Sequence, residues 1–178
     1  MPAQRERRAL LRAGTRGLAG LATLTGLIGL TGLGGCGFQL RQPPQLAFQR
    51  LALAGFAPDS PLAAGLRRAL AGQLRFVDTP AEAEVVLRAL TEARERSVAA
   101  TTAAGQVREL QLRLLVRVRA DTPDGRPLIA PLTLRLVREL STSETAALAK
   151  AEEEEALYAA MLADVVDQLT RRLAALRP

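Results

Sequence analysis

The segment VRELQLRLLVRVRA, Val107 to Ala120, alternates apolar and mostly charged residues along its whole length. Successive side chains of a β-strand point to opposite faces, so this pattern predicts a strand with one buried and one solvent-facing side. A turn sequence, Thr122 to Gly125, follows, and the alternation resumes from Leu128 to Leu136. We therefore predict that these two segments form a β-hairpin.

The segment Ala83 to Ala99, just upstream, contains signals for both a helix and a strand. Its alanine, glutamate and arginine residues favour a helix. However, Val85 and Leu87 alternate with Val86 and Arg88, which is typical of a two-faced strand. We favour the strand.

The sequence of the N-terminal part of the domain predicts one strand and one helix. The sequence LAFQRLALAGF, which begins at Leu46, favours a strand. Ser60 is a suitable N-cap and Pro61 suits the first helical position, so a helix should begin there and end near Arg75. Its apolar stripe repeats every four residues, at Leu62, Leu66, Leu70 and Leu74.

A long helix is predicted at the C-terminus. The segment Ser141 to Glu144 can cap it, and its apolar stripe comprises Leu157, Met161, Val165, Leu169, Leu173 and Leu176. The expected order is strand, helix, three strands, helix. This order predicts an α+β fold, a two-layer α/β sandwich in which two helices pack on a mixed four-stranded sheet, with the first two strands parallel.

The composition argues against an enzyme. The chain has no histidine and one cysteine, which excludes Ser-His-Asp and Cys-His catalysis, an internal disulfide and a Cys/His zinc site. The carboxylates of Glu152 to Glu155 spread around a helix axis and are more typical of a solvated helix than of an acid/base pair. We expect a binding protein with no metal and no cofactor.

The charge distribution argues against nucleic-acid binding. The formal net charge is +6, but five arginines and one glutamate precede Cys36, a net +4 that leaves +2 for the rest. The chain also has no tryptophan, one tyrosine and four phenylalanines, so few rings are available to stack on bases.

Residues 1–35 are typical of an export signal. An arginine-rich start is followed by an uncharged apolar run from Gly17 to Leu33, the order of a secretory signal peptide. A membrane-spanning helix needs about 20 apolar residues, and the glycines of this run weaken a helix, so we favour a cleaved signal. The pair Arg7-Arg8 is only faintly like a twin-arginine signal, and the general export route is our default.

The sequence Leu33-Gly34-Gly35-Cys36 resembles the lipobox of bacterial lipoproteins. That resemblance implies cleavage after Gly35, a diacylglyceryl group on the Cys36 thiol and acylation of the new amine; the alternative is a free buried cysteine. Several acyl chains hold a protein on a membrane, because each buried methylene contributes about 0.8 kcal/mol. Gly37, in place of an aspartate, indicates the periplasmic side of the outer membrane. We expect a signal peptide at 1–35, a lipidated tether at 36–45 and one domain at 46–178.

The sequence CGFQLR, Cys36 to Arg41, resembles the opening of the LptE family of lipopolysaccharide-assembly lipoproteins. Three further pieces resemble the family in the same order. They are Pro61-Leu62 at the first helix, Ala147-Leu148-Ala149-Lys150 before the acidic residues, and MLADVVDQLTRRL from Met161 to Leu173. The resemblance therefore spans nearly all of the chain after the signal.

The resemblance implies an outer-membrane protein that plugs the β-barrel LptD, helps that barrel assemble and binds lipopolysaccharide during its transport to the outer leaflet. The alternative is an envelope-maintenance or scaffold lipoprotein of the periplasmic face that does not bind lipopolysaccharide. Lys150 occupies the place of a family residue implicated in lipopolysaccharide binding. A second basic site of the family precedes a Gly-Gln pair, but Thr101 to Ala104 contains no basic residue, and Arg96 or Arg108 is a candidate substitute.

Four arginines of the predicted hairpin are further candidates for lipopolysaccharide binding. Lipopolysaccharide carries phosphates and acyl chains, so a partner needs cationic groups beside apolar surface. Arg113, Arg117 and Arg119 share one strand face, and Arg135 lies opposite an apolar stripe on the next strand. Each alone is expected to solvate the sheet, whereas together they form a candidate patch.

Overall fold

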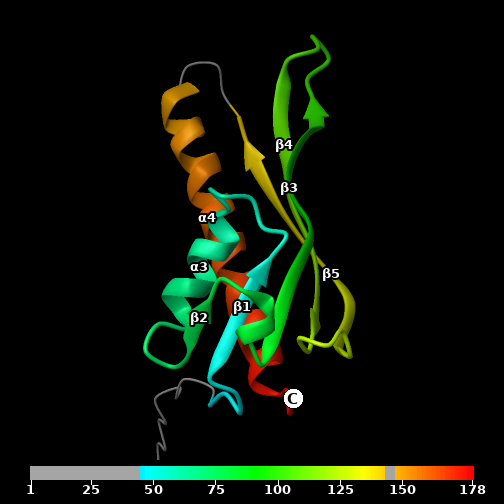
Figure 1. Cartoon of the computed structure of the whole chain (residues 1–178). Helices are drawn as coiled ribbons and strands as arrows, with labels where there is room; N and C mark the ends of the chain where they lie inside the picture. Colours follow the sequence, from blue (N-terminus) through cyan, green and yellow to red (C-terminus); the bar gives the residue numbers. More distant parts are fainter. Residues whose placement is uncertain (1–44, 143–146) are drawn as a thin grey trace, which may run out of the picture. The chain divides into compact units, whose positions relative to one another are not determined.

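The computed structural model describes residues 45–142 and 147–178 (Figure 1). The predicted signal peptide, Cys36 and nearly all of the predicted tether lie outside these residues. The elements are β1 (Arg50–Ala54), α3 (Pro61–Ala69), β2 (Arg75–Val77), the 3-10 helix η1 (Pro80–Glu82), β3 (Val85–Thr101), β4 (Val107–Asp121), β5 (Pro127–Ser141) and α4 (Ala147–Ala174).

The five strands form one mixed sheet in the order β2-β1-β3-β4-β5. β1 pairs in parallel with both β2 and β3, while β3–β4 and β4–β5 are antiparallel. The predicted α+β class, the parallel pairing of the first two predicted strands and the hairpin are therefore confirmed. The predicted number of four strands is wrong, because β2 is a fifth strand.

The missed strand β2 explains a second error. α3 ends at Ala69 rather than near Arg75, and Gly72 then takes a positive φ of 76° that turns the chain back toward β1. Arg75 pairs with Arg50, and Leu74 lies before the strand rather than on the helix. A strand of three residues is too short to show an alternating pattern.

The start of α3 is fixed by hydrogen bonds within the helix and to a strand. The Ala63 N–H donates a hydrogen bond to Ser60 Oγ over 3.0 Å, so the predicted N-cap is confirmed. The Ser60 hydroxyl in turn donates to Glu92 of β3 over 2.6 Å, and the Leu62 N–H donates to the same carboxylate over 3.2 Å. A distant strand therefore helps to fix the start of the helix, since it accepts an otherwise free N–H.

The segment with mixed signals, Ala83 to Ala99, lies largely in β3, as predicted. β3 pairs with β1 along its first residues and with β4 along nearly all of its length. Pairing on both sides outweighs the helix propensity of its alanine, glutamate and arginine residues. β1 itself begins at Arg50 rather than at Leu46, and residues 143–146 of the predicted α4 cap lie outside the described residues.

α3 and α4 lie together on one face of the sheet (Figure 1). Gly65 allows their close approach, because a Cβ there would lie 2.8 Å from Val166 Cγ2. The aliphatic core between helices and sheet includes Leu51, Leu62, Leu66, Leu70, Leu87, Leu112, Leu114, Val116, Met161, Val165, Leu169 and Leu173. Among the described residues, no helix is sufficiently long and apolar to cross a membrane.

Candidate functional site

The end of the domain that carries the β3–β4 hairpin contains an open hollow. The hairpin of β3 and β4 extends beyond the rest of the sheet, and its turn closes with the Gly105 N–H donating to Thr102 O over 2.9 Å. The hairpin end from Ser97 to Gln106 contains no charged residue. The first turns of α4 lie at the same end (Figure 1). We refer to the hollow between them as the tip groove.

The tip groove has a volume of about 660 Å³ and opens to solvent. Val98 and Val107 in its wall are 55% and 38% exposed, which is unusual for large apolar side chains. Apolar lining comes from both layers of the fold: Val98, Val107, Leu110, Leu140, Ala147 and Ala151. Polar lining comes from Arg96, Ser97, Thr142, Lys150 and Glu154. The groove is therefore an apolar trough with a few charged groups.

Lys150 is the only lysine of the chain and lies in this groove. Its ammonium group donates to Glu153 Oε2 over 2.7 Å and to Ser141 Oγ over 3.4 Å. The Lys150 side chain is 26% exposed, so the ion pair remains open to water and to competing anions. A phosphate could exchange with Glu153 without unfolding any element.

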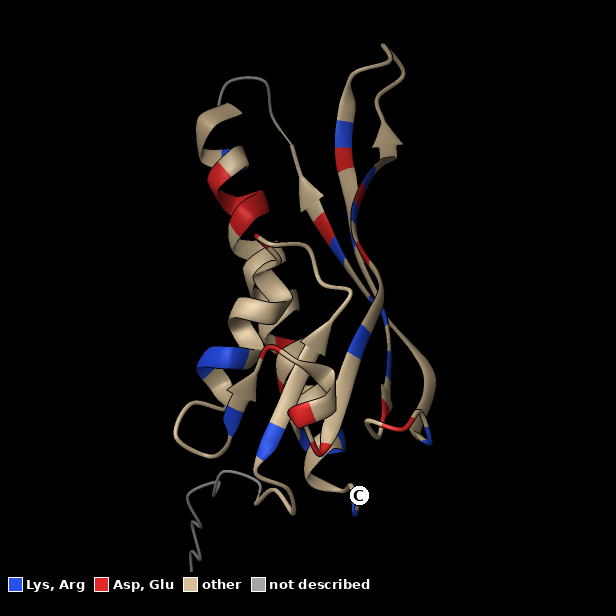
Figure 2. Ribbon diagram, in the orientation of Figure 1, with Lys and Arg blue, Asp and Glu red and all other residues tan. Residues whose placement is uncertain are grey.

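The acidic residues Glu152 to Glu155 lie in the first half of α4, where Figure 2 shows them in red. Two of them form ion pairs with β3, in addition to solvating the helix. Glu155 pairs with Arg94 over 3.1 Å and Glu154 pairs with Arg96 over 3.3 Å. Both arginines belong to β3, so these pairs connect the first half of α4 to the hairpin. Arg96, a candidate substitute for the missing basic residue, thus lines the tip groove beside Lys150, whereas Arg108 does not.

Tyr158 marks the place where the packed part of α4 begins. Its hydroxyl donates to the carbonyl oxygen of Glu95 over 2.8 Å, and the Arg94 guanidinium lies 4.9 Å from its ring centroid. Burial raises the pKa of Tyr158, with a further contribution from the Glu154 carboxylate. Arg94 was not identified from the sequence, although its two-residue spacing from Arg96 places both on the helix-facing side of β3.

The four arginine candidates lie on the other face of the sheet, which α3 and α4 do not cover. Leu112, Leu114 and their even-numbered neighbours in β4 face the helices, so the odd-numbered arginines face away. Arg135 pairs across the strands with Leu115, which lies between Arg113 and Arg117. The structure therefore brings the four arginines together but separates them from Lys150, and the two groups cannot form a single small site.

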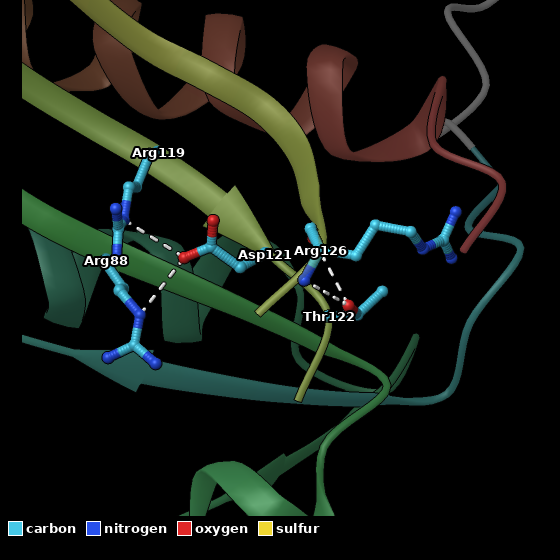
Figure 3. Close-up of polar contacts among 5 residues, drawn as sticks. All are labelled: Arg88, Arg119, Asp121, Thr122 and Arg126. Atoms are coloured by element: carbon cyan, nitrogen blue, oxygen red, sulfur yellow. Dashed lines mark hydrogen bonds and ion pairs between the residues drawn. The ribbon is translucent and has the colours of Figure 1, made fainter. Parts of the chain in front are cut away.

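Arg119 has a neighbour that was not predicted. Figure 3 shows Arg88 of β3 and Arg119 of β4 converging on the Asp121 carboxylate, at 3.2 Å and 3.1 Å. The Asp121 side chain is only 6% exposed. A buried carboxylate between two guanidinium groups is well compensated, so this triad is best explained as a structural clasp between β3 and β4. Sequence spacing gives no signal for a contact between residues 88 and 121.

The described residues contain no group of three or more His, Cys, Asp or Glu side chains that could hold a metal ion.

The polar contacts next to the clasp also close a turn. In Figure 3, the Arg126 N–H donates to Thr122 Oγ1 over 3.0 Å. A hydrogen bond from Thr122 to the Asp124 carboxylate lowers the pKa of Asp124. These contacts stabilise the β4–β5 turn.

Comparisons with known proteins identify relatives across the domain. A family model described as "LptE: Lipopolysaccharide-assembly" matches residues 48–173. The NMR structure of uncharacterized lipoprotein B from Nitrosomonas europaea is similar at 29% identity and a TM-score of 0.66, over 78% of this chain and 91% of that one. Rare lipoprotein B from Shewanella oneidensis is similar at 26% identity and a TM-score of 0.61, over 71% and 95% of the two chains.

A third solved structure supports the fold alone. The minor lipoprotein from Acinetobacter baumannii is 23% identical, with a TM-score of 0.60, over 75% of this chain and 99% of that one. No curated protein matches the chain.

Proposed function

Because the chain belongs to the LptE family of lipopolysaccharide-assembly proteins, we propose that it binds lipopolysaccharide during transport to the outer leaflet. In this proposal the protein is an outer-membrane lipoprotein without catalytic activity. An acylated Cys36 anchors it on the periplasmic side. It forms a complex with the β-barrel LptD and assists the assembly of that barrel.

The observation that supports lipopolysaccharide binding is the combination of apolar walls and cations in the tip groove. Lipopolysaccharide presents acyl chains next to phosphates, so its binding site needs apolar surface beside a charged donor. Val98, Leu110 and Leu140 supply the apolar wall, and Lys150 and Arg96 supply cations at the edge. Lys is a compact charge whose hydrogen bonds to phosphate are charge-assisted, and these are stronger than bonds between neutral groups.

The Glu153 carboxylate next to Lys150 allows a control variant whose effect on lipopolysaccharide affinity is opposite in direction or absent. Glu153 neutralises Lys150 in the free protein, so a phosphate must displace it. Removing the Glu153 charge should therefore strengthen lipopolysaccharide binding or leave it unchanged. Removing or reversing the Lys150 charge should weaken binding, because the phosphate then loses its donor.

The experiment is a titration of purified lipopolysaccharide against the full-length chain in detergent. Lys150→Asp should weaken binding by roughly ten- to a hundredfold, the size of one charge-assisted hydrogen bond. Glu153→Gln, three residues away on the same helix, is the matched control. Wild-type affinity in Lys150→Asp would contradict this site. No binding by the wild-type chain would favour a scaffold lipoprotein instead.

The proposed complex with the barrel is tested separately. Affinity purification of the full-length lipidated chain from outer membranes should retain LptD, and depletion of the chain should reduce assembled barrel and surface lipopolysaccharide. A chain that is recovered alone, with normal surface lipopolysaccharide after depletion, would contradict this part of the proposal.

A further inference from the structure

The face of β3, β4 and β5 that no helix covers is a second charged surface, and the proposed function assigns it no role. We call it the arginine face and define it by Arg88, Arg113, Arg117, Arg119 and Arg135, with Leu115 at its centre. The register places Glu95, opposite Arg113, and Glu139, opposite Gln111, on the same face. From Arg113 to Arg119 the surface extends about 20 Å along β4, at about 3.4 Å per residue.

The arginines of this face are ion-paired at one end and largely unpaired at the other. Arg88 and Arg119 share the buried Asp121 carboxylate. In contrast, Arg117 and Arg135 are exposed and form no hydrogen bond or ion pair within residues 45–142 and 147–178.

Arg113 is only weakly compensated. Its guanidinium donates to Gln111 Oε1 and lies 3.9 Å from Glu95, near the limit for an ion pair. The largely unpaired end therefore presents three arginines around Leu115.

Three like charges cluster around Leu115, within reach of one another along the diagonals of the ladder, and repel one another. Arg135 lies directly opposite Leu115 in the ladder, and Arg113 and Arg117 are its diagonal neighbours on β4. A partner that supplies carboxylates would remove that repulsion. Arginine around a partly buried leucine is also typical of protein interfaces, where arginine is enriched.

The shape and charge of the arginine face indicate that its binding partner is a protein surface rather than a lipid. Its hollow at Glu95, Arg113, Leu115 and Arg135 is about 350 Å³ and is lined by mostly polar groups, so it lacks the apolar trough of the tip groove. The Glu95 and Glu139 carboxylates also lie among the arginines, in addition to Asp121. A set of phosphates would be repelled by them, whereas a protein surface can oppose both signs of charge.

We propose that the arginine face docks on acidic side chains of the inner wall of the β-barrel partner, and this proposal rests on the proposed function. The wall of such a barrel is itself an antiparallel sheet with polar side chains facing the lumen. A sheet face without a covering helix can approach that wall closely. Lys150 and the tip groove lie on the opposite face, so one molecule can contact the wall and lipopolysaccharide at the same time.

The test is co-purification of LptD with the full-length lipidated chain, at several salt concentrations. Arg117→Glu/Arg135→Glu should reduce the retained barrel by about tenfold or more, because charges that face a partner contribute strongly to association. Arg117→Gln/Arg135→Gln should give a smaller loss. Lipopolysaccharide titration of both variants should match the wild type within about twofold, since neither residue lines the tip groove.

The matched control is Arg67→Glu/Arg68→Glu, which changes the same number of exposed charges on α3. It should retain the barrel at the wild-type level. Arg117→Glu/Arg135→Glu should unfold thermally like the wild type, because both side chains are exposed. Arg67→Glu/Arg68→Glu replaces basic residues in the last turn of α3 and should be slightly less stable while remaining folded.

Three outcomes would overturn the inference, and they are distinguishable. Full retention of the barrel by Arg117→Glu/Arg135→Glu contradicts the docking surface alone. Loss of lipopolysaccharide binding with the barrel retained assigns the face to lipopolysaccharide instead. A wild-type chain that retains no barrel contradicts the proposed function as well.

Discussion

The two halves of α4 are held in place by different forces. From Tyr158 to Leu173 the helix buries seven side chains against α3 and the sheet, whereas from Ala147 to Leu157 it buries none. The first half is instead connected to β3 by partly exposed ion pairs at Glu154 and Glu155. Buried apolar area stabilises by about 25 cal/mol per Å², while an exposed ion pair contributes about 0–1 kcal/mol. The fold therefore depends on the second half, and the first half is available to form a binding groove.

The largest expected effect comes from a cavity in the packed half. Leu169 is 1% exposed, and Leu169→Ala should reduce the free energy of unfolding by about 2–5 kcal/mol. Urea unfolding of the full-length chain measures this change. The matched substitution Leu148→Ala, at a leucine that is 77% exposed in the first half, should change it by less than about 0.5 kcal/mol. Equal effects at the two leucines would contradict the comparison.

An intermediate effect is expected at the boundary between the halves. Tyr158→Phe removes the hydrogen bond to the Glu95 carbonyl and should cost about 1 kcal/mol at neutral pH.

The same residue predicts a pH dependence of stability. Burial raises the pKa of Tyr158, so the folded state holds the proton more tightly than the unfolded state. The resulting stabilisation is present below the ordinary tyrosine pKa of 10.0 and is lost as the pH rises through the folded-state pKa. Tyr158 is the only tyrosine, so its absorbance titration reports this group alone. A Tyr158→Phe variant with the same alkaline loss of stability would assign that loss to other groups.

The smallest effect is expected in the first half. Glu155→Gln breaks the pair with Arg94 and should lower the free energy of unfolding by about 0.2–1 kcal/mol. Amide hydrogen exchange should become faster from Ala147 to Leu157 and stay unchanged beyond Tyr158. Glu152→Gln, in the same acidic run, is the control. If Glu155→Gln destabilised the whole domain as strongly as Leu169→Ala, the ion pairs would be essential to the fold.

Local sequence patterns predicted most of the architecture. Alternation along Val107 to Ala120 and the four-residue repeats of the helices were sufficient, because one buried face imposes a period on each element. The short strand β2 was missed since three residues cannot show a period. The start of α3 was predicted from Ser60, but Glu92, which also contacts that start, lies 32 residues from Ser60 and has no local signature.

The candidate site was less predictable for the same reason. The alternation placed Arg113, Arg117 and Arg119 on one face of their strand, and the structure agrees. The same alternation implies that the helices cover the leucine face, opposite these arginines. Which residues of the β3–β4 hairpin lie next to Lys150 depends on long-range packing, and no local pattern encodes that. The structure therefore divides one set of lipopolysaccharide candidates into two surfaces.

The central claim is that the open end of the domain binds lipopolysaccharide at Lys150. As Lys150 is the only lysine, an amine-reactive reagent can report its accessibility when the modified peptide is measured by mass spectrometry. We predict that saturating lipopolysaccharide slows modification of Lys150 severalfold in the full-length chain, and that the Glu153→Gln variant shows the same protection. Unchanged modification at a lipopolysaccharide concentration that saturates the protein would contradict the claim.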